Sequence, residues 1–213
     1  MSDLPISSLP ELTATALTQN AEFAVAQGGT TYKVKNSNLS PYPKAYGLFS
    51  QTGDSTPISA TTSELSLIDG GIGTLSVPAS GFSVGDSFTA EIAGVLNVGN
   101  NQTLRIRVKS NSVVLLDSGA QTITNITNDV WNMSITFTIR QIGGAGVASI
   151  VSLGAFHYTK TNNGTVEGFS FNTVNNTTFD TTIQNTLDIT AEWGAVNALN
   201  SIYSDIFVLN KTY

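Results

Sequence analysis

Apolar and polar residues alternate along most of the chain after about residue 40, and this period of two limits the fold to one built from strands. In the two clearest runs the apolar positions are Leu104, Ile106 and Val108, and Met133, Ile135, Phe137 and Ile139. The polar positions between them are Arg105, Arg107 and Lys109, and Ser134, Thr136, Thr138 and Arg140. Because successive side chains of a strand point to opposite faces, we predict that the apolar set faces the core and the polar set faces water or a partner.

Turn-forming residues divide this region into short segments. The candidate strands are residues 45–51, 64–68, 73–77, 87–96, 102–109, 112–117, 132–142, 147–159, 164–171, 186–193 and 201–209. Gly70-Gly71, Ser110-Asn111 and the glycine-rich residues 143–146 supply turns between them. The only helix candidates are residues 12–19 and a turn around 195–200. Several short strands at such spacing predict an all-β, antiparallel sandwich or barrel.

A smaller β segment precedes this region. Two alternating runs, residues 22–27 and 30–35, flank Gly28-Gly29, a pair that favours a tight hairpin turn. A lone hairpin is only marginally stable in water, so we expect this one to dock on another surface. The apolar residues expected to make that contact are Leu9, Phe23, Val25, Tyr32 and Val34.

A proline pair separates the two regions. Pro41 and Pro43 lack backbone donors and hold the chain extended, which places a boundary near Ser40. We therefore predict an N-terminal segment, residues 1–40, and a main domain, residues 41–213; 213 residues suffice for one substantial core plus a small appendage. The alternative is that the hairpin is the first strand pair of one larger β fold.

Two parts of the chain resemble known virion proteins. Residues 6–39 resemble the short N-terminal modules of tail-fibre, head-fibre and other virion appendage proteins of double-stranded DNA phages and viruses. Residues 132–146, 168–182 and 187–194, with the closing strand 206–209, look like the C-terminal domains of such appendages. Those domains are thought to be jelly rolls related to the tumour-necrosis-factor and complement C1q heads, which are trimers.

The resemblance implies a fold, a set of partners and a location. The fold is an antiparallel jelly-roll β-sandwich preceded by the hairpin segment. The implied function is a non-enzymatic virion structural protein, a fibre, spike or capsid decoration, which is a homotrimer and binds other virion proteins through residues 1–40. Host-surface glycan is a further expected partner, and the expected location is the virion, assembled in a host cytoplasm.

Composition narrows the classes of partner and chemistry. Charged residues make up 11% of the chain against roughly 25% in an ordinary domain, and the net charge is −6, which argues against nucleic acid. Cysteine is absent, so disulfides and thiolate metal sites are excluded. We find neither a signal-peptide pattern nor a stretch of roughly 18 apolar residues and expect no membrane insertion. The densest basic group, residues 105–109, reads as a solvated strand face, or as a site for acidic glycans or a neighbouring subunit.

No set of residues in the sequence forms a recognisable catalytic motif, and we expect neither an enzyme nor a bound metal or cofactor. His157 is the only histidine, and its position inside a strand-like run predicts a half-buried or interface residue. The carboxylates that could serve glycoside hydrolysis are Glu91, Glu167, Asp180, Asp188 and Glu192, which are scattered along the chain. The glycine-rich residues 143–146 lead into a strand, which predicts a hairpin turn instead of a phosphate loop.

Polar loops and aromatic residues are the remaining candidates for recognition. The residues we select as candidate ligand or receptor contacts are Asn100, Asn101, Asn175 and Asn176, in loops rich in Asn, Thr and Gly. Trp131 and Trp193 either pack in the core or stack on a sugar ring. The rival functions are a carbohydrate-binding, lectin-like module not tied to a virion, and a glycan-degrading appendage.

Overall fold

The structure is a computed structural model that describes residues 22–27, 30–35, 46–161 and 164–213. The chain divides into two compact units, Met1–Lys44 and Ala45–Tyr213, which we call the N-terminal unit and the head. In the N-terminal unit, strands β1 (Glu22–Gln27) and β2 (Thr30–Lys35) pair antiparallel, with Gln27 opposite Thr30. The predicted hairpin is therefore confirmed, with the predicted strand bounds. The candidate helix at residues 12–19 lies outside the described residues.

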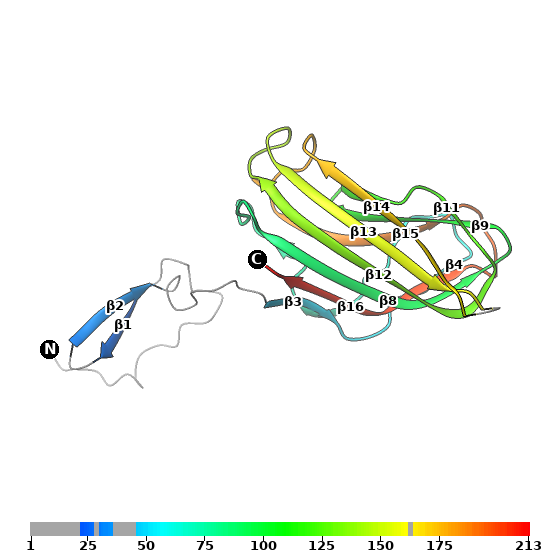
Figure 1. The fold of residues 1–213 in the computed structure, drawn as a ribbon, viewed down its shortest axis with the longest axis horizontal. Helices are drawn as coiled ribbons and strands as arrows, with labels where there is room; N and C mark the ends of the chain where they lie inside the picture. Colours follow the sequence, from blue (N-terminus) through cyan, green and yellow to red (C-terminus); the bar gives the residue numbers. More distant parts are fainter. Residues whose placement is uncertain (1–21, 28–29, 36–45, 162–163) are drawn as a thin grey trace. The chain divides into compact units, whose positions relative to one another are not determined.

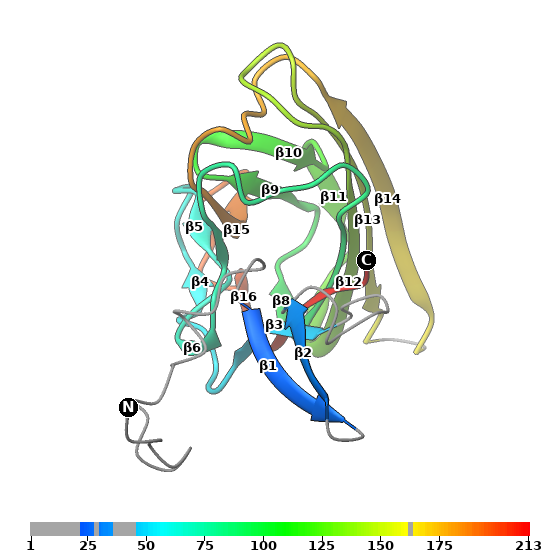
Figure 2. The ribbon, with the colours of Figure 1, turned by 90° about the vertical axis from the view of Figure 1, so that its left-hand side faces the viewer.

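The head is an antiparallel β-sandwich. Its larger sheet has the strand order β14 (Val166–Asn175), β13 (Ser149–Thr159), β12 (Ile126–Gln141), β8 (Ser87–Val98), β16 (Ser201–Lys211), β3 (Tyr46–Gln51) and β6 (Gly71–Gly73), with β4 (Ile58–Ser59) beside β16. Its smaller sheet has the order β10 (Val113–Asp117), β9 (Gln102–Ser110), β15 (Asn185–Trp193) and β5 (Leu65–Ser66), with β11 (Gln121–Ile123) beside β9 and β7 (Ser76–Val77) beside β15. Figure 2 shows the two layers, with β9 and β15 on one side and β12, β13 and β14 on the other.

The predicted all-β class is confirmed, since the described residues of the chain form strands and no helix. In the part of the chain that the structure describes, no helix is long and apolar enough to cross a membrane. The 195–200 segment is a series of bends and turns between β15 and β16.

The predicted alternation is confirmed in both runs. Leu104, Ile106 and Val108 are fully buried at 0% exposure. Met133, Ile135, Phe137 and Ile139 are buried as well. Trp131 and Trp193 also lie inside the sandwich, so packing in the core is the correct account of both indoles and stacking on a sugar is not.

Several strand bounds differ from the prediction. β12 starts at Ile126 instead of residue 132, and the predicted 73–77 strand is divided between β6 and β7. β13 starts at Ser149 instead of residue 147, because the backbone N–H groups of Val147 and Ala148 both donate to the carbonyl oxygen of Gly144 at 2.9 Å and close a turn. The short strands β4 and β11 were not predicted, since two or three residues carry no readable alternation.

Strand direction gives the head two distinct ends. At one end β3 begins and β16 finishes, with Tyr46 opposite Lys211, and the turn after Gln141 lies at this end too. We call it the Lys211 end. The turn after Val98, which contains Asn100, marks the opposite end, which we call the Asn100 end.

Candidate functional site

The asparagines selected from the sequence lie at opposite ends of the head. Asn100 and Asn101 form the β8–β9 turn at the Asn100 end, where Asn101 has a positive φ of 52°. Asn175 is the last residue of β14 and Asn176 follows it, at the Lys211 end. The structure therefore does not bring the four residues together into one site.

Asn175 stabilises the start of the β14–β15 loop through side-chain hydrogen bonds. Its Oδ1 accepts the backbone N–H groups of Thr178 and Phe179, both at 3.1 Å, and its Nδ2 donates to the carbonyl oxygen of Val114 at 3.2 Å. These bonds fix the start of the β14–β15 loop and place Phe179, which is 1% exposed, in the interior. Asn176, by contrast, is exposed.

The residues selected for attachment fall on the hairpin, except Leu9, which lies outside the described residues. The register pairs Phe23 with Val34 and Val25 with Tyr32. These four positions thus form two pairs of the β1–β2 ladder, with the Ala24–Lys33 pair between them. Tyr32 is 53% exposed.

The basic strip on β9 is matched by acidic residues on neighbouring segments. Its cations are Arg105, Arg107 and Lys109, and its carboxylates are Glu64, Asp117 and Glu192. One Arg107 nitrogen, Nη1, lies 2.7 Å from a Glu64 oxygen and 2.6 Å from a Glu192 oxygen. Arg105 donates from Nε to Asp117 at 2.8 Å, and Lys109 lies 3.1 Å from Glu64. Each cation of the strip therefore has a carboxylate of the same protein beside it.

The network lowers the pKa of two of its carboxylates, Asp117 and Glu64. A hydrogen bond from Arg105 lowers the pKa of Asp117, against the opposing effect of burial. For Glu64, burial raises the pKa, but hydrogen bonds from Thr190 and Lys109 together with the charge of Arg107 outweigh it and leave the pKa lowered. The strip is thus a closed ion-pair network on the outer face of the smaller sheet.

The remaining sequence candidates for chemistry are dispersed. His157 is half-buried on β13, with Asn132 and Gly168 as its register partners. The five candidate carboxylates each bond to a neighbour of their own: Glu91 to Ser134, Glu167 to Tyr158 and Lys160, Asp180 to Thr182, Asp188 to Ser66, and Glu192 to Arg107. Among the residues that the structure describes, no group of three or more His, Cys, Asp or Glu side chains is placed to hold a metal ion.

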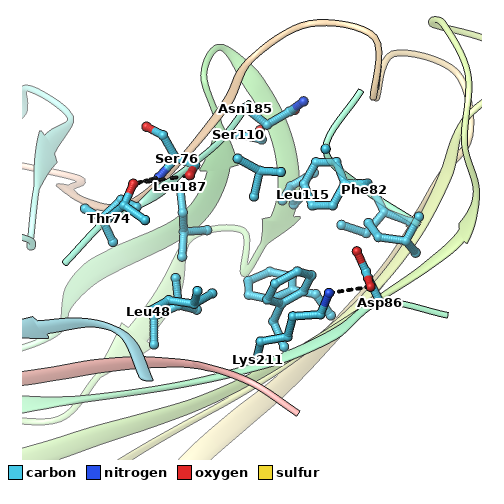
Figure 3. Close-up of a pocket in the computed structure, with 18 of the residues that line it drawn as sticks. Leu48, Thr74, Ser76, Phe82, Asp86, Ser110, Leu115, Asn185, Leu187 and Lys211 are labelled. Carbon is cyan, nitrogen blue, oxygen red and sulfur yellow. Dashed lines mark hydrogen bonds and ion pairs between the residues drawn. The ribbon is translucent and has the colours of Figure 1, made fainter. Parts of the chain in front are cut away.

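The feature best suited to bind a ligand is a cavity at the Lys211 end, between the two sheets (Figure 3). Its volume is about 350 Å³. The larger sheet contributes apolar walls through Phe88, Phe137, Ile139, Ile150 and Leu209, and the smaller sheet through Leu115 and Leu187.

Two loops cover the cavity. Pro78 and Phe82 come from the segment between β7 and β8, and Phe179 comes from the β14–β15 loop. The two loops are joined by the backbone N–H of Ser80, which donates to the carbonyl oxygen of Thr181 at 2.8 Å. The cover therefore consists of loop residues that are fixed to each other, not of a strand ladder.

A few polar groups line the cavity. Lys211 Nζ lies 2.5 Å from Asp86 Oδ1, and the other Asp86 oxygen accepts the backbone N–H of Ser83 at 2.9 Å. Farther along the wall, the Ser110 hydroxyl donates to Asn185 Oδ1 at 2.7 Å. Figure 3 shows the Asp86–Lys211 pair on one side of the space and Ser110 and Asn185 on another.

Sequence reasoning missed this site. Asp86 and Lys211 are 125 residues apart and stand in ordinary strand-end positions, so nothing in the sequence marks them as a pair. The one local signal is the run Val113–Leu116, four consecutive apolar residues in a strand that should alternate. A register shift between Val114 and Leu116 allows both leucines to be buried, and Leu115 lines the cavity.

Comparison of the chain with models of known protein families, with curated proteins and with solved structures finds no match.

Proposed function

We propose that this chain is a non-enzymatic structural protein of a virion, in which the N-terminal unit attaches the chain to the particle and the head is displayed. The observation that carries the proposal is the division into two compact units, of which the described part of the smaller one is a two-stranded hairpin. An isolated hairpin is only marginally stable in water, so we expect this unit to be stabilised by binding to a partner surface.

The strand order supports the more specific expectation of a jelly roll. The chain crosses repeatedly between the sheets: β8 is in the larger, β9 in the smaller, β12 in the larger, β15 in the smaller and β16 in the larger, while β13 and β14 follow β12 within the larger sheet. Neighbouring strands such as β8 and β16, or β9 and β15, are therefore distant in sequence, which supports a jelly roll.

The outer face of the larger sheet is where we place the contacts of a homotrimer. Across its middle, the register aligns Asn172, Leu153, Thr136, Thr89 and Asn210, a row without charge. Leu153 is 52% exposed in this row. A row without charge can pack against a second copy with little desolvation of charge, and closed symmetry would bury it in every subunit.

The Asn100 end is the part of the head we assign to host contact. The described chain of the head begins at Tyr46, at the Lys211 end, so the Asn100 end is remote from the point at which the chain enters. Its β8–β9 turn offers the amide groups of Asn100 and Asn101 to a glycan.

The test is immunogold electron microscopy of particles released from the source culture, with an antibody against residues 45–213. Gold on the particles, and its loss when the chain is expressed without residues 1–40, is the expected result. Unlabelled particles in a lysate that contains the free protein would overturn the proposal. In that case, sugar binding by the free protein would favour a lectin, and turnover of a host polysaccharide would favour a glycan-degrading enzyme.

A further inference from the structure

The cavity at the Lys211 end is large enough to hold a small organic molecule. Apolar cavities of about 150 Å³ stay dry and bind benzene. The cavity here, of about 350 Å³, is more than twice that size and lies at the lower limit of ordinary ligand pockets, which start at roughly 300 Å³. An occupant with about two fused rings fits this space.

The walls select for an apolar molecule. Most of the lining side chains are aliphatic or aromatic, and three phenylalanines, Phe82, Phe88 and Phe179, lie around the space with ring centroids of Phe82 at 6.1 Å from Phe88 and 5.9 Å from Phe179. Aromatic rings in such a setting contact another ring favourably by edge or offset packing. Transfer of an apolar ligand from water into this space is favoured by about 25 cal/mol for each Å² of apolar surface removed.

The charged pair selects against a charged ligand. Asp86 is 7% exposed, and its carboxylate is balanced by Lys211, so the pair contributes no net charge to the cavity. An anionic ligand would add a second negative group beside Asp86, and a cationic ligand would add a second positive group beside Lys211. Either would leave one buried charge without compensation, which is costly in an apolar setting.

The same pair retains capacity for a neutral polar group. The Lys211 ammonium has three N–H donors, of which the Asp86 bond uses one. Phe88 lies beside it, with Lys211 Nζ 5.8 Å from the ring centroid. A hydroxyl group on a ligand ring can accept from Lys211 and donate to Asp86 without changing the charge balance.

We propose that the head binds, in the cavity at the Lys211 end, a small neutral aromatic alcohol whose hydroxyl group meets the Asp86–Lys211 pair. This site is independent of the virion assignment, since it depends only on the described head.

The test is isothermal titration calorimetry of the full chain with four probes of matched shape: naphthol, naphthalene, naphthylmethylammonium and naphthoate. Naphthol should bind best, and naphthoate and the ammonium compound should bind at least about tenfold more weakly, a difference of about 1.4 kcal/mol. No binding by naphthol up to its solubility limit, or equal binding by all four probes, would overturn the proposal.

A matched pair of variants tests whether the ligand binds in the cavity. Leu115→Phe adds a ring edge to the cavity wall and should reduce naphthol affinity by at least about tenfold. Leu153→Phe makes the same change on the outer face of the larger sheet and should leave the affinity unchanged. Near-ultraviolet circular dichroism checks that both variants fold. Undiminished binding by a folded Leu115→Phe protein would place the ligand elsewhere and contradict the proposal.

A third variant tests the role of the charged pair. Asp86→Asn leaves the Lys211 charge unbalanced, so naphthoate should gain affinity relative to naphthol. If this variant folds and keeps the preference for naphthol, the pair does not contact the ligand and the proposed selectivity is wrong. If Asp86→Asn does not fold, the double variant Asp86→Asn, Lys211→Gln restores neutrality. This double variant should bind naphthol and naphthalene equally well. A retained preference for naphthol over naphthalene would contradict the proposal.

Discussion

The two ends of the head are packed in different ways. Near the Asn100 end, Trp131 stacks on Phe156 with ring centroids 5.3 Å apart, and Phe156 stacks on Phe169 at 5.0 Å. Both indole N–H groups donate to backbone carbonyl oxygens, Trp131 to Tyr203 at 3.1 Å and Trp193 to Ile58 at 3.0 Å. At the Lys211 end, phenylalanines instead surround the cavity of about 350 Å³.

The difference follows from which segments supply the side chains. The indoles and their partners are strand residues held in register by ladders, on both sides for Trp131 and Phe156 and on one side for Trp193 and Phe169. Phe82 and Phe179 come from loops whose positions depend on a few specific hydrogen bonds. A strand ladder brings side chains to fixed spacings that large rings fill, whereas the loop cover spans the opening of the sandwich and leaves space beneath it.

The largest effect is expected from truncation of a core ring. Phe137 is 4% exposed and lines the cavity wall, so Phe137→Ala should lower the free energy of unfolding by about 3–5 kcal/mol. Urea denaturation followed by circular dichroism measures this change. A loss below about 1 kcal/mol would show that this ring contributes little packing, and that the Lys211 end is looser than described.

Two substitutions that each add three carbon atoms contrast the ends directly. Ala191→Leu enlarges a fully buried residue close to Trp193 and should destabilise the protein by about 1–3 kcal/mol, because the core there has no free space. Leu115→Phe at the cavity should instead stabilise it by about 0.5–2 kcal/mol. Thermal unfolding of both variants and of the parent protein measures the two changes in stability. The same sign for both would remove the distinction between a filled end and an open one.

The ionisation of Tyr158 at alkaline pH tests the packing near the Asn100 end. Burial, followed by its hydrogen bond to Glu167 at 3.0 Å, raises the pKa of Tyr158 from 10.0 to about 12. A raised pKa in the folded state means that its contribution to stability is complete below pH 10 and is lost as pH rises toward 12. Tyr158→Phe should lose less stability over this range, as measured by denaturation at a series of pH values. Parallel curves for the two proteins would show that this phenol ionises as it does in the unfolded chain.

The smallest effect is expected from the ion-pair network on β9. The pKa values of Asp117 and Glu64 are lowered from 3.8 and 4.5 respectively, so their contribution is complete above about pH 4.5 and declines as pH falls through the lowered values. Because the network is partly exposed, Asp117→Asn should cost only about 0.2–1 kcal/mol at neutral pH. The stability of Asp117→Asn should fall less steeply than that of the parent protein as the pH is lowered, as measured by denaturation at a series of acidic pH values. The same dependence on pH for both proteins would show that Asp117 is not held in the network in solution.

The sequence predicts the strands of the packed regions well, and physical reasons explain the exceptions. In β9 and β12 the alternation of residue types is itself the signal that locates the core face, and the burial of Ile106 and Ile135 agrees with it. At β10 the alternation fails, because a register shift turns both Leu115 and Leu116 inward. Sequence periodicity assumes a regular pleat, so it cannot foresee a bulge.

The candidate site could not be predicted from sequence periodicity, for a different reason. The cavity is formed by loops and strands brought together from Leu48 to Lys211, and the partners Asp86 and Lys211 are 125 residues apart. The three basic residues of β9 were visible in the sequence, but Glu64, the carboxylate that bonds Arg107 and Lys109, comes from a distant segment. Local pattern identifies which face a residue is on, and tertiary pairing decides what that residue meets there.

The central claim is that the head is a complete domain and that the N-terminal unit serves attachment. Thermal unfolding of a chain that lacks residues 1–40, measured beside the full chain by differential scanning calorimetry, tests this claim most directly. We predict that the main transition keeps its Tm, because the strands of the described head pair with each other and their core residues are all at position 49 or later. A head that unfolds, or melts at a much lower temperature, without residues 1–40 would show that the hairpin is an integral strand pair of one domain and would contradict this account.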